Sequence, residues 1–170
     1  MINTKILLMG VSGTGKSLIG RLLADALGIF FIDGDDFHPQ ANLDKMKSGI
    51  PLTDSDREGW LKALNRELIR HPCLILACSA LKPEYRHLLK ENNQELMVLY
   101  LKGSYEVILH RHKKRQDHFF NGENMLKSQF DTLIEPSHDE AICIEVDQAI
   151  ECIVEQALIA IRNERSRYLS

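Results

Sequence analysis

The chain has 170 residues, of which 44% are hydrophobic and 26% are charged, as is typical of one globular domain that buries a substantial core. Its formal net charge of −3 argues against a general basic surface for nucleic acid. No signal peptide precedes the first strand-like run and no apolar stretch reaches the roughly 20 residues of a membrane span, so we expect a cytoplasmic protein that no membrane anchors.

Strand-like and helix-like segments alternate along the chain. The first apolar run, residues 5–9, ends at Gly10, and an amphipathic helical pattern over residues 17–27 ends at Gly28. A second strand is expected over residues 29–32. The alternation then continues, with strands expected at residues 74–77, 96–101 and 142–146 and helices at residues 84–90, 105–114 and 149–161. Apolar strands separated by helices predict a three-layer α/β/α fold, in which helices cover both faces of a parallel sheet.

Two segments are longer than this alternation requires. Residues 37–70 insert far more than a simple crossover between the second and third strands, and residues 115–137 are polar and contain Gly122. Because ligands bind beyond the carboxyl ends of the strands in open α/β sheets, we expect both insertions to lie there.

The cysteines and the carboxyl-terminal tail have no expected function. The four cysteines include no C-x-x-C pair, and Cys78 and Cys143 fall in strand-like runs, so we expect buried reduced thiols rather than a metal site or disulfides. The polar tail from Arg162 is expected to fray.

The segment after the first strand carries the strongest functional signal. It matches the phosphate-binding pattern G-x-x-x-x-G-K-[ST] with Gly10, Val11, Ser12, Gly13, Thr14, Gly15, Lys16 and Ser17. Glycines in such a loop let backbone N–H groups turn toward phosphate oxygens, and the following helix directs its positive end at the same anion. We expect Lys16 to reach the β- and γ-phosphates of ATP and the Ser17 hydroxyl to ligate Mg²⁺. The sequence lacks the N-K-x-D that GTPases use to read guanine, so a small-molecule or nucleotide kinase is the expected class.

An acidic cluster, Asp33-Gly34-Asp35-Asp36, follows the second expected strand. Three carboxylates beside a phosphate loop would repel one another and the nucleotide, and Mg²⁺ together with a hydroxyl-bearing substrate would relieve that repulsion. If the strand geometry continues, Asp33 and Asp35 point to the same side. A helix N-cap is the alternative, and it would account for Asp36 but not for all three.

The segment Ser55-Asp-Arg-Glu58 fits a capping box that opens a helix, which places Arg57 in the first turn. A cation is electrostatically unfavourable there, because the start of a helix is already positive. Two explanations are equally open. Either the carboxylates of Asp54, Asp56 and Glu58 neutralise Arg57, or Arg57 binds an anionic ligand.

A basic run, residues 110–115, is expected at the end of a helix. Favourable charge at a helix C-terminus accounts for His110, Lys113 and Lys114. Arg111 and Arg115 lie one turn apart, which would let them hold the phosphoryl group during its transfer.

Taken together, these motifs resemble the gluconokinases of the P-loop carbohydrate-kinase group, which have a shikimate-kinase-like fold. The matching segments span nearly the whole chain and are MGVSGTGKS, DGDDFHP, NLDKMKSGIPLTDSDREGWL, CSALKPEYRHLL, YLKGSYEVI, HFF and LKSQFDTLIEP. The resemblance implies phosphorylation of D-gluconate at its terminal hydroxyl by ATP with Mg²⁺, giving 6-phospho-D-gluconate. It also implies a five-stranded parallel sheet, a substrate-binding insertion over residues 37–70, a lid over residues 115–135 and a homodimer.

The resemblance assigns roles to the residues that match the family's motifs. Asp35 would take the acceptor hydroxyl, Asp33 would support Mg²⁺ through water, and Arg57 would hold the acid group. Contacts with the polyol are expected from His38 and Lys45. A further family motif, matched by Ser79, Lys82 and Arg86, lies near the substrate. Arg111 and Arg115 would act with the lid.

Two positions depart from the family pattern. Gly59 stands where the family usually has proline and would loosen its helix, and Asp117 stands where it usually has glycine and would slow closure of the lid. Two other functions stay open: a kinase of shikimate or another small hydroxy acid or nucleoside, and a nucleotide-binding module without transfer activity. Asp33, Asp35 and Arg57 favour transfer, because a binding module needs only the loop.

Overall fold

Five parallel strands form one sheet, in a computed structural model that describes residues 3–115 and 122–167. The strands are β1 (Thr4–Met9), β2 (Phe30–Asp33), β3 (Cys73–Ala77), β4 (Met97–Lys102) and β5 (Ile142–Glu145). Their order across the sheet is β2–β3–β1–β4–β5, so the strand that leads into the phosphate loop lies at the centre. Every residue of β1 is buried, because β3 and β4 pair with its two sides and helices cover both faces.

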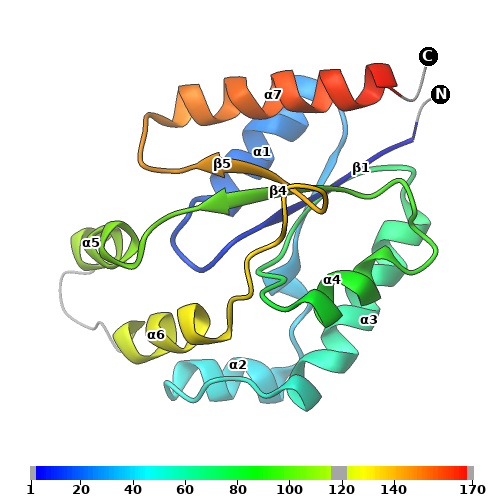
Figure 1. Cartoon of the computed structure of the whole chain (residues 1–170). Coiled ribbons are helices and arrows are strands. Elements are labelled where there is room, and N and C mark those ends of the chain that lie inside the picture. The colour runs from blue at the N-terminus through cyan, green and yellow to red at the C-terminus, as the bar shows by residue number, and fades with distance from the viewer. Residues whose placement is uncertain (1–2, 116–121, 168–170) are drawn as a thin grey trace.

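Helices form the outer two layers (Figure 1). On one face α1 (Lys16–Leu27) packs beside α7 (Ile150–Arg167), and on the other α3 (Asp54–Arg70) packs beside α4 (Pro83–Lys90). The predicted three-layer fold with a five-stranded parallel sheet is therefore confirmed. None of the helices in the described ranges is both long and apolar enough to cross a membrane.

The remaining helices gather at the carboxyl ends of the strands (Figure 1). They are the short 3-10 helix η1 (Gly34–Phe37), α2 (Gln40–Lys47), α5 (Tyr105–Arg115) and α6 (Gly122–Thr132). Within the expected insertion, α3 is the crossover helix that covers the sheet, so the extra part is residues 37–53. In the second insertion, α6 packs against α5.

The carboxyl-terminal helix is longer than the sequence predicts. α7 continues to Arg167, although fraying is expected from Arg162. The Ser166 hydroxyl donates to the Arg162 carbonyl at 3.0 Å, and Arg167 pairs with Glu164 at 2.5 Å. Local contacts therefore continue the helix beyond its apolar stripe, and the expectation of fraying is wrong for residues 162–167.

The cysteines differ in exposure. Cys78 is buried as expected, and burial raises the pKa of its thiol to about 12. Cys143 and Cys152 are exposed, and Cys73 is half-buried. The expectation that Cys143 is buried is wrong, because β5 is an edge strand whose residues alternate, and Ile144 is the one that faces the core.

Candidate active site

The phosphate loop, residues 10–17, joins β1 to α1 in a conformation that its glycines permit. Gly13 (φ +89°) and Gly15 (φ +93°) lie in the left-handed region, where a residue with a Cβ is strained. The buried Thr14 hydroxyl donates to the Val11 carbonyl at 3.0 Å and closes the turn. No side chain caps α1, so the N–H groups of its first turn are left to donate hydrogen bonds to a bound anion.

Lys16 folds back over this loop. Its Nζ donates to the Val11 carbonyl at 2.9 Å. Desolvation by burial lowers the pKa of Lys16, against the attraction of Asp35 and Asp33, which raises it. Lys16 also lines the cavity beside the loop, where its ammonium can offset the charge of a bound phosphate.

That cavity has a volume of about 490 Å³, which suits a small-molecule site. It is bounded by the loop, the carboxyl end of β2, α2 and α3 with their connection, and the helices α5 and α6. Its polar lining residues are Ser12, Lys16, Ser17, Arg21, Asp33, Asp35, His38, Arg57, Ser79, His112, Arg115, Ser128 and Gln129. Both insertions thus contribute to one site at the carboxyl edge of the sheet.

Asp33 links the acidic cluster to the phosphate loop. Its Oδ2 accepts a hydrogen bond from the Ser17 hydroxyl, and its Oδ1 accepts from the backbone N–H of Asp35 at 3.1 Å. Hydroxyl and carboxylate oxygens at a phosphate site are the ligands that Mg²⁺ takes beside water and phosphate, so the pair fits that ion. Within the described ranges no group of three or more His, Cys, Asp or Glu side chains is placed to hold a metal ion.

The backbone turn that carries Asp35 differs from the sequence expectation. β2 ends at Asp33, and the chain then enters η1 with Asp33 as its N-cap, so the strand alternation does not continue and the capping role belongs to Asp33 rather than Asp36. Gly34 allows this turn to lie against the sheet, because a Cβ there would come within 2.6 Å of the Ala77 carbonyl oxygen. The Trp60 indole N–H donates to the Gly34 carbonyl at 2.7 Å and holds the turn on α3.

Asp35 projects into the cavity with 82% of its side chain accessible. The pKa of its carboxyl is raised: the cavity walls around the exposed side chain partly desolvate the charged form, and the charges of Asp33 and Asp36 add to the rise, while Lys16 opposes it. A carboxylate with a raised pKa is a better proton acceptor, so the environment of Asp35 suits a group that orients and deprotonates a hydroxyl.

His38 forms a wall of the same cavity. Its ring stacks on Trp60 with centroids 4.1 Å apart and only 4% of the side chain is accessible. Burial, together with the charge of Arg57, lowers the pKa of His38 to about 4. The ring is therefore neutral at physiological pH. Its Nδ1 lies 3.3 Å from the Asn42 carboxamide nitrogen, which can only donate, so Nδ1 accepts and Nε2–H is left as a donor to a hydroxyl group.

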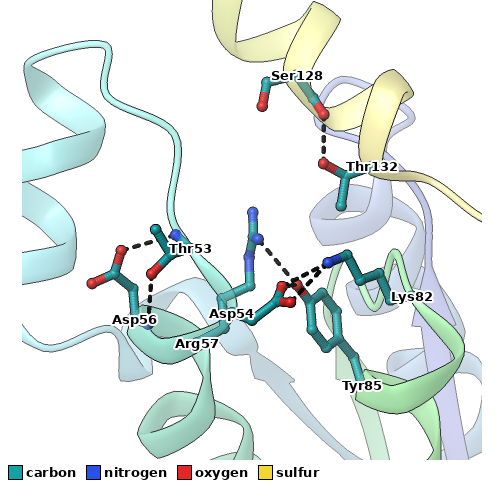
Figure 2. Close-up of polar contacts among 8 residues, drawn as sticks. All are labelled: Thr53, Asp54, Asp56, Arg57, Lys82, Tyr85, Ser128 and Thr132. Carbon is teal, nitrogen blue, oxygen red and sulfur yellow. Dashed lines mark hydrogen bonds and ion pairs between the residues drawn. The ribbon is translucent and has the colours of Figure 1, made fainter.

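Arg57 projects from the start of α3 toward the part of the cavity where α6 presents Ser128 (Figure 2). Its Nη1 donates to the Tyr85 hydroxyl at 3.2 Å, and its guanidinium lies 5.5 Å from the centroid of the Tyr85 ring. The Tyr85 hydroxyl in turn donates to Asp54, which Lys82 also pairs with at 2.8 Å.

The acids beside Arg57 in the sequence have other partners. Asp54 pairs with Lys82, Asp56 with Lys45 and Glu58 with Lys62. Across residues 3–115 and 122–167 no carboxylate forms an ion pair with Arg57. Of the two explanations that the sequence leaves open, the geometry favours an anionic ligand.

The capping box of α3 lies two residues earlier than predicted. Thr53 is the N-cap, and its hydroxyl accepts from the Asp56 N–H at 3.2 Å while the Asp56 carboxylate accepts from the Thr53 N–H at 2.8 Å. Lys45 donates to both oxygens of Asp56 at 2.8 Å and does not line the cavity. The expected contact of Lys45 with substrate is therefore not supported, because this helix cap engages its charge.

Two of the expected arginines also lie outside the cavity. Arg86 is fully buried, where it donates to Glu140 at 2.6 Å and to the Ala80 carbonyl at 2.9 Å. Arg111 donates to the Val146 carbonyl beyond the end of β5. The geometry thus does not support a substrate role for Arg86 or for Arg111, and only Arg115 of the expected pair lines the cavity. Asp117 lies outside the described residues.

Tyr85, His112 and Gln129 are among the residues at the site to which the sequence analysis assigns no role. The His112 ring packs on Gly13, and its Nε2 lies 3.2 Å from the Ser12 carbonyl oxygen. Gln129 accepts from the Ser12 N–H at 2.7 Å. Tyr85 and Gln129 fall in the family-like segments CSALKPEYRHLL and LKSQFDTLIEP, but no spacing rule predicts which partners they meet.

Comparisons with known proteins agree with this geometry. The family model described as shikimate kinase matches residues 12–162. The thermoresistant gluconokinase of Escherichia coli K12 is 44% identical over 161 residues, which cover 91% of this chain and 91% of that protein. The thermosensitive gluconokinase of the same organism is 42% identical over 174 residues, covering 97% and 92%.

Solved structures give the same result. A gluconokinase from Sinorhizobium meliloti 1021 has a TM-score of 0.91 and 38% identity, over 99% of this chain and 98% of that one. A shikimate kinase from Aquifex aeolicus, with a TM-score of 0.63 and 17% identity over 95% and 98% of the two chains, shares the fold.

Proposed function

The chain belongs to the gluconokinase family, a family of kinases that act on gluconate, and we propose that its cavity transfers the γ-phosphoryl group of ATP to the terminal hydroxyl of D-gluconate. The product is 6-phospho-D-gluconate. The observation that carries this proposal is Arg57, whose guanidinium lines the same cavity as the phosphate loop and Asp35 but forms no ion pair with a carboxylate of the described residues.

The nucleotide end of the site is the loop. The N–H groups that follow Ser12 in the loop and those of the first turn of α1 donate to the triphosphate, and Lys16 offsets the charge of the β- and γ-phosphates. Ser17 and Asp33 would hold Mg²⁺, which when bound screens the negative charge of the phosphates. Arg115, which lines the cavity from the end of α5, would contact the transferred group from the lid side.

The acceptor part of the site holds gluconate at both ends of the molecule. Arg57 binds the carboxylate, the neutral His38 ring donates from Nε2 to the polyol, and Asp35 receives the terminal hydroxyl. Holding the carboxylate at one end leaves the other end in line with the γ-phosphorus, which accounts for the position that is phosphorylated. Asp35 then takes the hydroxyl proton as the new bond to phosphorus forms.

One assay tests this function against the alternatives. ADP release from ATP and Mg²⁺ is measured with D-gluconate, with shikimate and with no acceptor. Release that depends on D-gluconate supports the proposal, and release that depends on shikimate indicates a kinase of another hydroxy acid. ATP binding without release under any of the three conditions would leave a nucleotide-binding module. A homodimer is a further proposal, which light scattering on the purified chain tests.

A further inference from the structure

The Gln129 side chain connects the lid segment to the phosphate loop. Gln129 lies on α6, and its Oε1 accepts a hydrogen bond from the backbone N–H of Ser12 at 2.7 Å, across 117 positions of the sequence. The residue lines the same cavity as Lys16 and Asp35. Gln129 therefore lies at the junction between the loop that holds the donor and the cavity that receives the acceptor.

The chemistry of this contact fixes the orientation of the carboxamide. A backbone N–H can only donate, so the oxygen of Gln129 must face the loop and the nitrogen must point elsewhere. No acceptor among the described residues takes a hydrogen from Nε2, and the described chain has no buried side-chain nitrogen without a partner. Nε2 is therefore accessible, on a residue that lines the cavity, and no described acceptor takes its two hydrogens.

We propose that Gln129 is a catalytic residue whose Nε2–H groups donate to the phosphoryl group in transit, while the Ser12 N–H holds the carboxamide in place. This inference rests on the proposed function, because it assumes transfer in this cavity. The γ-phosphorus leaves the bridging oxygen of ATP and bonds to the terminal oxygen of gluconate, ADP departs, and the hydroxyl proton passes to Asp35. Gln129 exchanges no proton or electron pair, and it contributes a fixed neutral donor where negative charge is spread over the equatorial oxygens.

A different role for the same hydrogen bond would be a latch that keeps the Ser12 N–H from the nucleotide. Phosphate oxygens accept charge-assisted hydrogen bonds, which are about twice as strong as those of a neutral amide, so nucleotide would displace such a latch. The two roles predict opposite effects. Removing a latch tightens nucleotide binding, whereas removing a catalytic donor slows transfer and leaves nucleotide affinity nearly unchanged.

Two variants separate the functions of the carboxamide. Gln129→Glu keeps the shape and the oxygen that faces Ser12 but replaces the donor with a carboxylate, and Gln129→Leu removes both. We expect kcat to fall on the order of 10²-fold in both variants. For Gln129→Leu we expect the KM for gluconate and the Kd for ADP to stay within about threefold of wild type. Lys127→Gln, on the same helix but outside the cavity, is the control and should match wild type.

Thermal melting first establishes that each variant is folded, and acceptor-independent ATP hydrolysis is measured beside the gluconate assay. Wild-type kcat in both folded Gln129 variants would overturn the inference, and so would tighter ADP binding with an undiminished kcat, which identifies a latch. If wild type does not turn over gluconate, the proposed function fails. The inference is then judged on hydrolysis, where transfer to water should also slow in Gln129→Leu.

Discussion

Arg57 and Tyr85 are in direct contact, and a hydrogen bond of 3.2 Å from Arg57 Nη1 to the Tyr85 hydroxyl orients the guanidinium. The same hydroxyl donates to Asp54 Oδ1, and Lys82 donates to both oxygens of that carboxylate, at 2.8 and 2.9 Å (Figure 2). The partner of Arg57 is thus a neutral hydroxyl, whose own hydrogen is donated to Asp54. Arg57 is held in position without being neutralised, so its charge is left for a substrate carboxylate.

Replacing Arg57 with alanine should act mainly on gluconate binding. Hydrogen bonds to charged groups contribute about 1.5–3 kcal/mol, so we expect the KM for gluconate to rise about 10- to 100-fold. The KM for ATP and, at saturating gluconate, kcat should change little. Steady-state kinetics with each substrate varied in turn provide the measurement, and unchanged gluconate kinetics would remove Arg57 from the site.

Tyr85→Phe keeps the buried ring and removes only the hydroxyl that orients Arg57. We expect a rise in the KM for gluconate of about 2- to 10-fold, the value of one neutral hydrogen bond, with kcat nearly constant. Tyr105→Phe is a matched control, because Tyr105 packs edge-on against Phe130 and has no contact with Arg57. An equal effect of the two substitutions would argue against the orienting role.

Asp35→Asn should abolish most turnover, because asparagine cannot accept the hydroxyl proton. The pKa of Asp35 is raised, so the wild-type kcat should fall in acid at a higher pH than an ordinary aspartate would give. The pH profile of kcat provides the measurement. Near wild-type kcat in the variant would rule out the base.

The same substitution should stabilise the fold at neutral pH. The folded-state pKa of Asp35 lies above its unfolded value, so the proton is bound more tightly in the folded state. The associated stability is present below the unfolded pKa and is lost as the pH rises through the folded pKa. At neutral pH the ionised carboxylate of Asp35 therefore lowers the free energy of unfolding, and asparagine removes this effect. The raised pKa is the net result, so it already includes the attraction of Lys16. Melting curves should show a higher Tm for the variant at pH 7 and a smaller difference in acid; a lower Tm at pH 7 contradicts the sign.

Lys45→Met tests whether this lysine is structural. Lys45 pairs with Asp56, and that pairing, with the hydrogen bonds from Thr53, lowers the pKa of Asp56 to about 2. Removing the ammonium should lower the Tm, because the ion pair between α2 and the start of α3 is lost. The KM for gluconate should stay at the wild-type value. A marked rise in that KM with an unchanged Tm would restore Lys45 as a substrate contact.

Gly59→Ala should stabilise the protein without changing its kinetics. Gly59 is exposed within α3, has no positive φ, and an added Cβ would meet no atom within 4 Å. Replacing such a glycine is worth about 0.5–1 kcal/mol, or roughly 1–4 °C in Tm for a domain of this size. Differential scanning calorimetry measures the shift, and a decrease in Tm would mean that the glycine has a structural role in this helix.

Much of the site was predictable from the sequence because it depends on short segments. The loop, the end of β2 and the start of α3 each lie in a local pattern, and Lys16, Ser17, Asp33, Asp35 and Arg57 all line one cavity. The wrong details are also local: β2 stops at Asp33 and turns, and Thr53 outcompetes Ser55 as the cap of α3. Propensity alone does not resolve such boundaries of one or two residues.

What the sequence by itself determined is the alternation of strands and helices, the phosphate loop and the kinds of charge that follow it, because periodicity and backbone conformation depend on neighbours in the chain. Only the tertiary structure decided which charges remain for a ligand. Arg86 and Arg57 carry the same guanidinium, but Arg86 donates to Glu140, 54 positions away, whereas within the described ranges Arg57 donates to a tyrosine hydroxyl and pairs with no carboxylate. Whether a charge is paired depends on distances of a few ångströms between segments that are remote in sequence. Burial then determines how much the pairing or its absence changes the free energy.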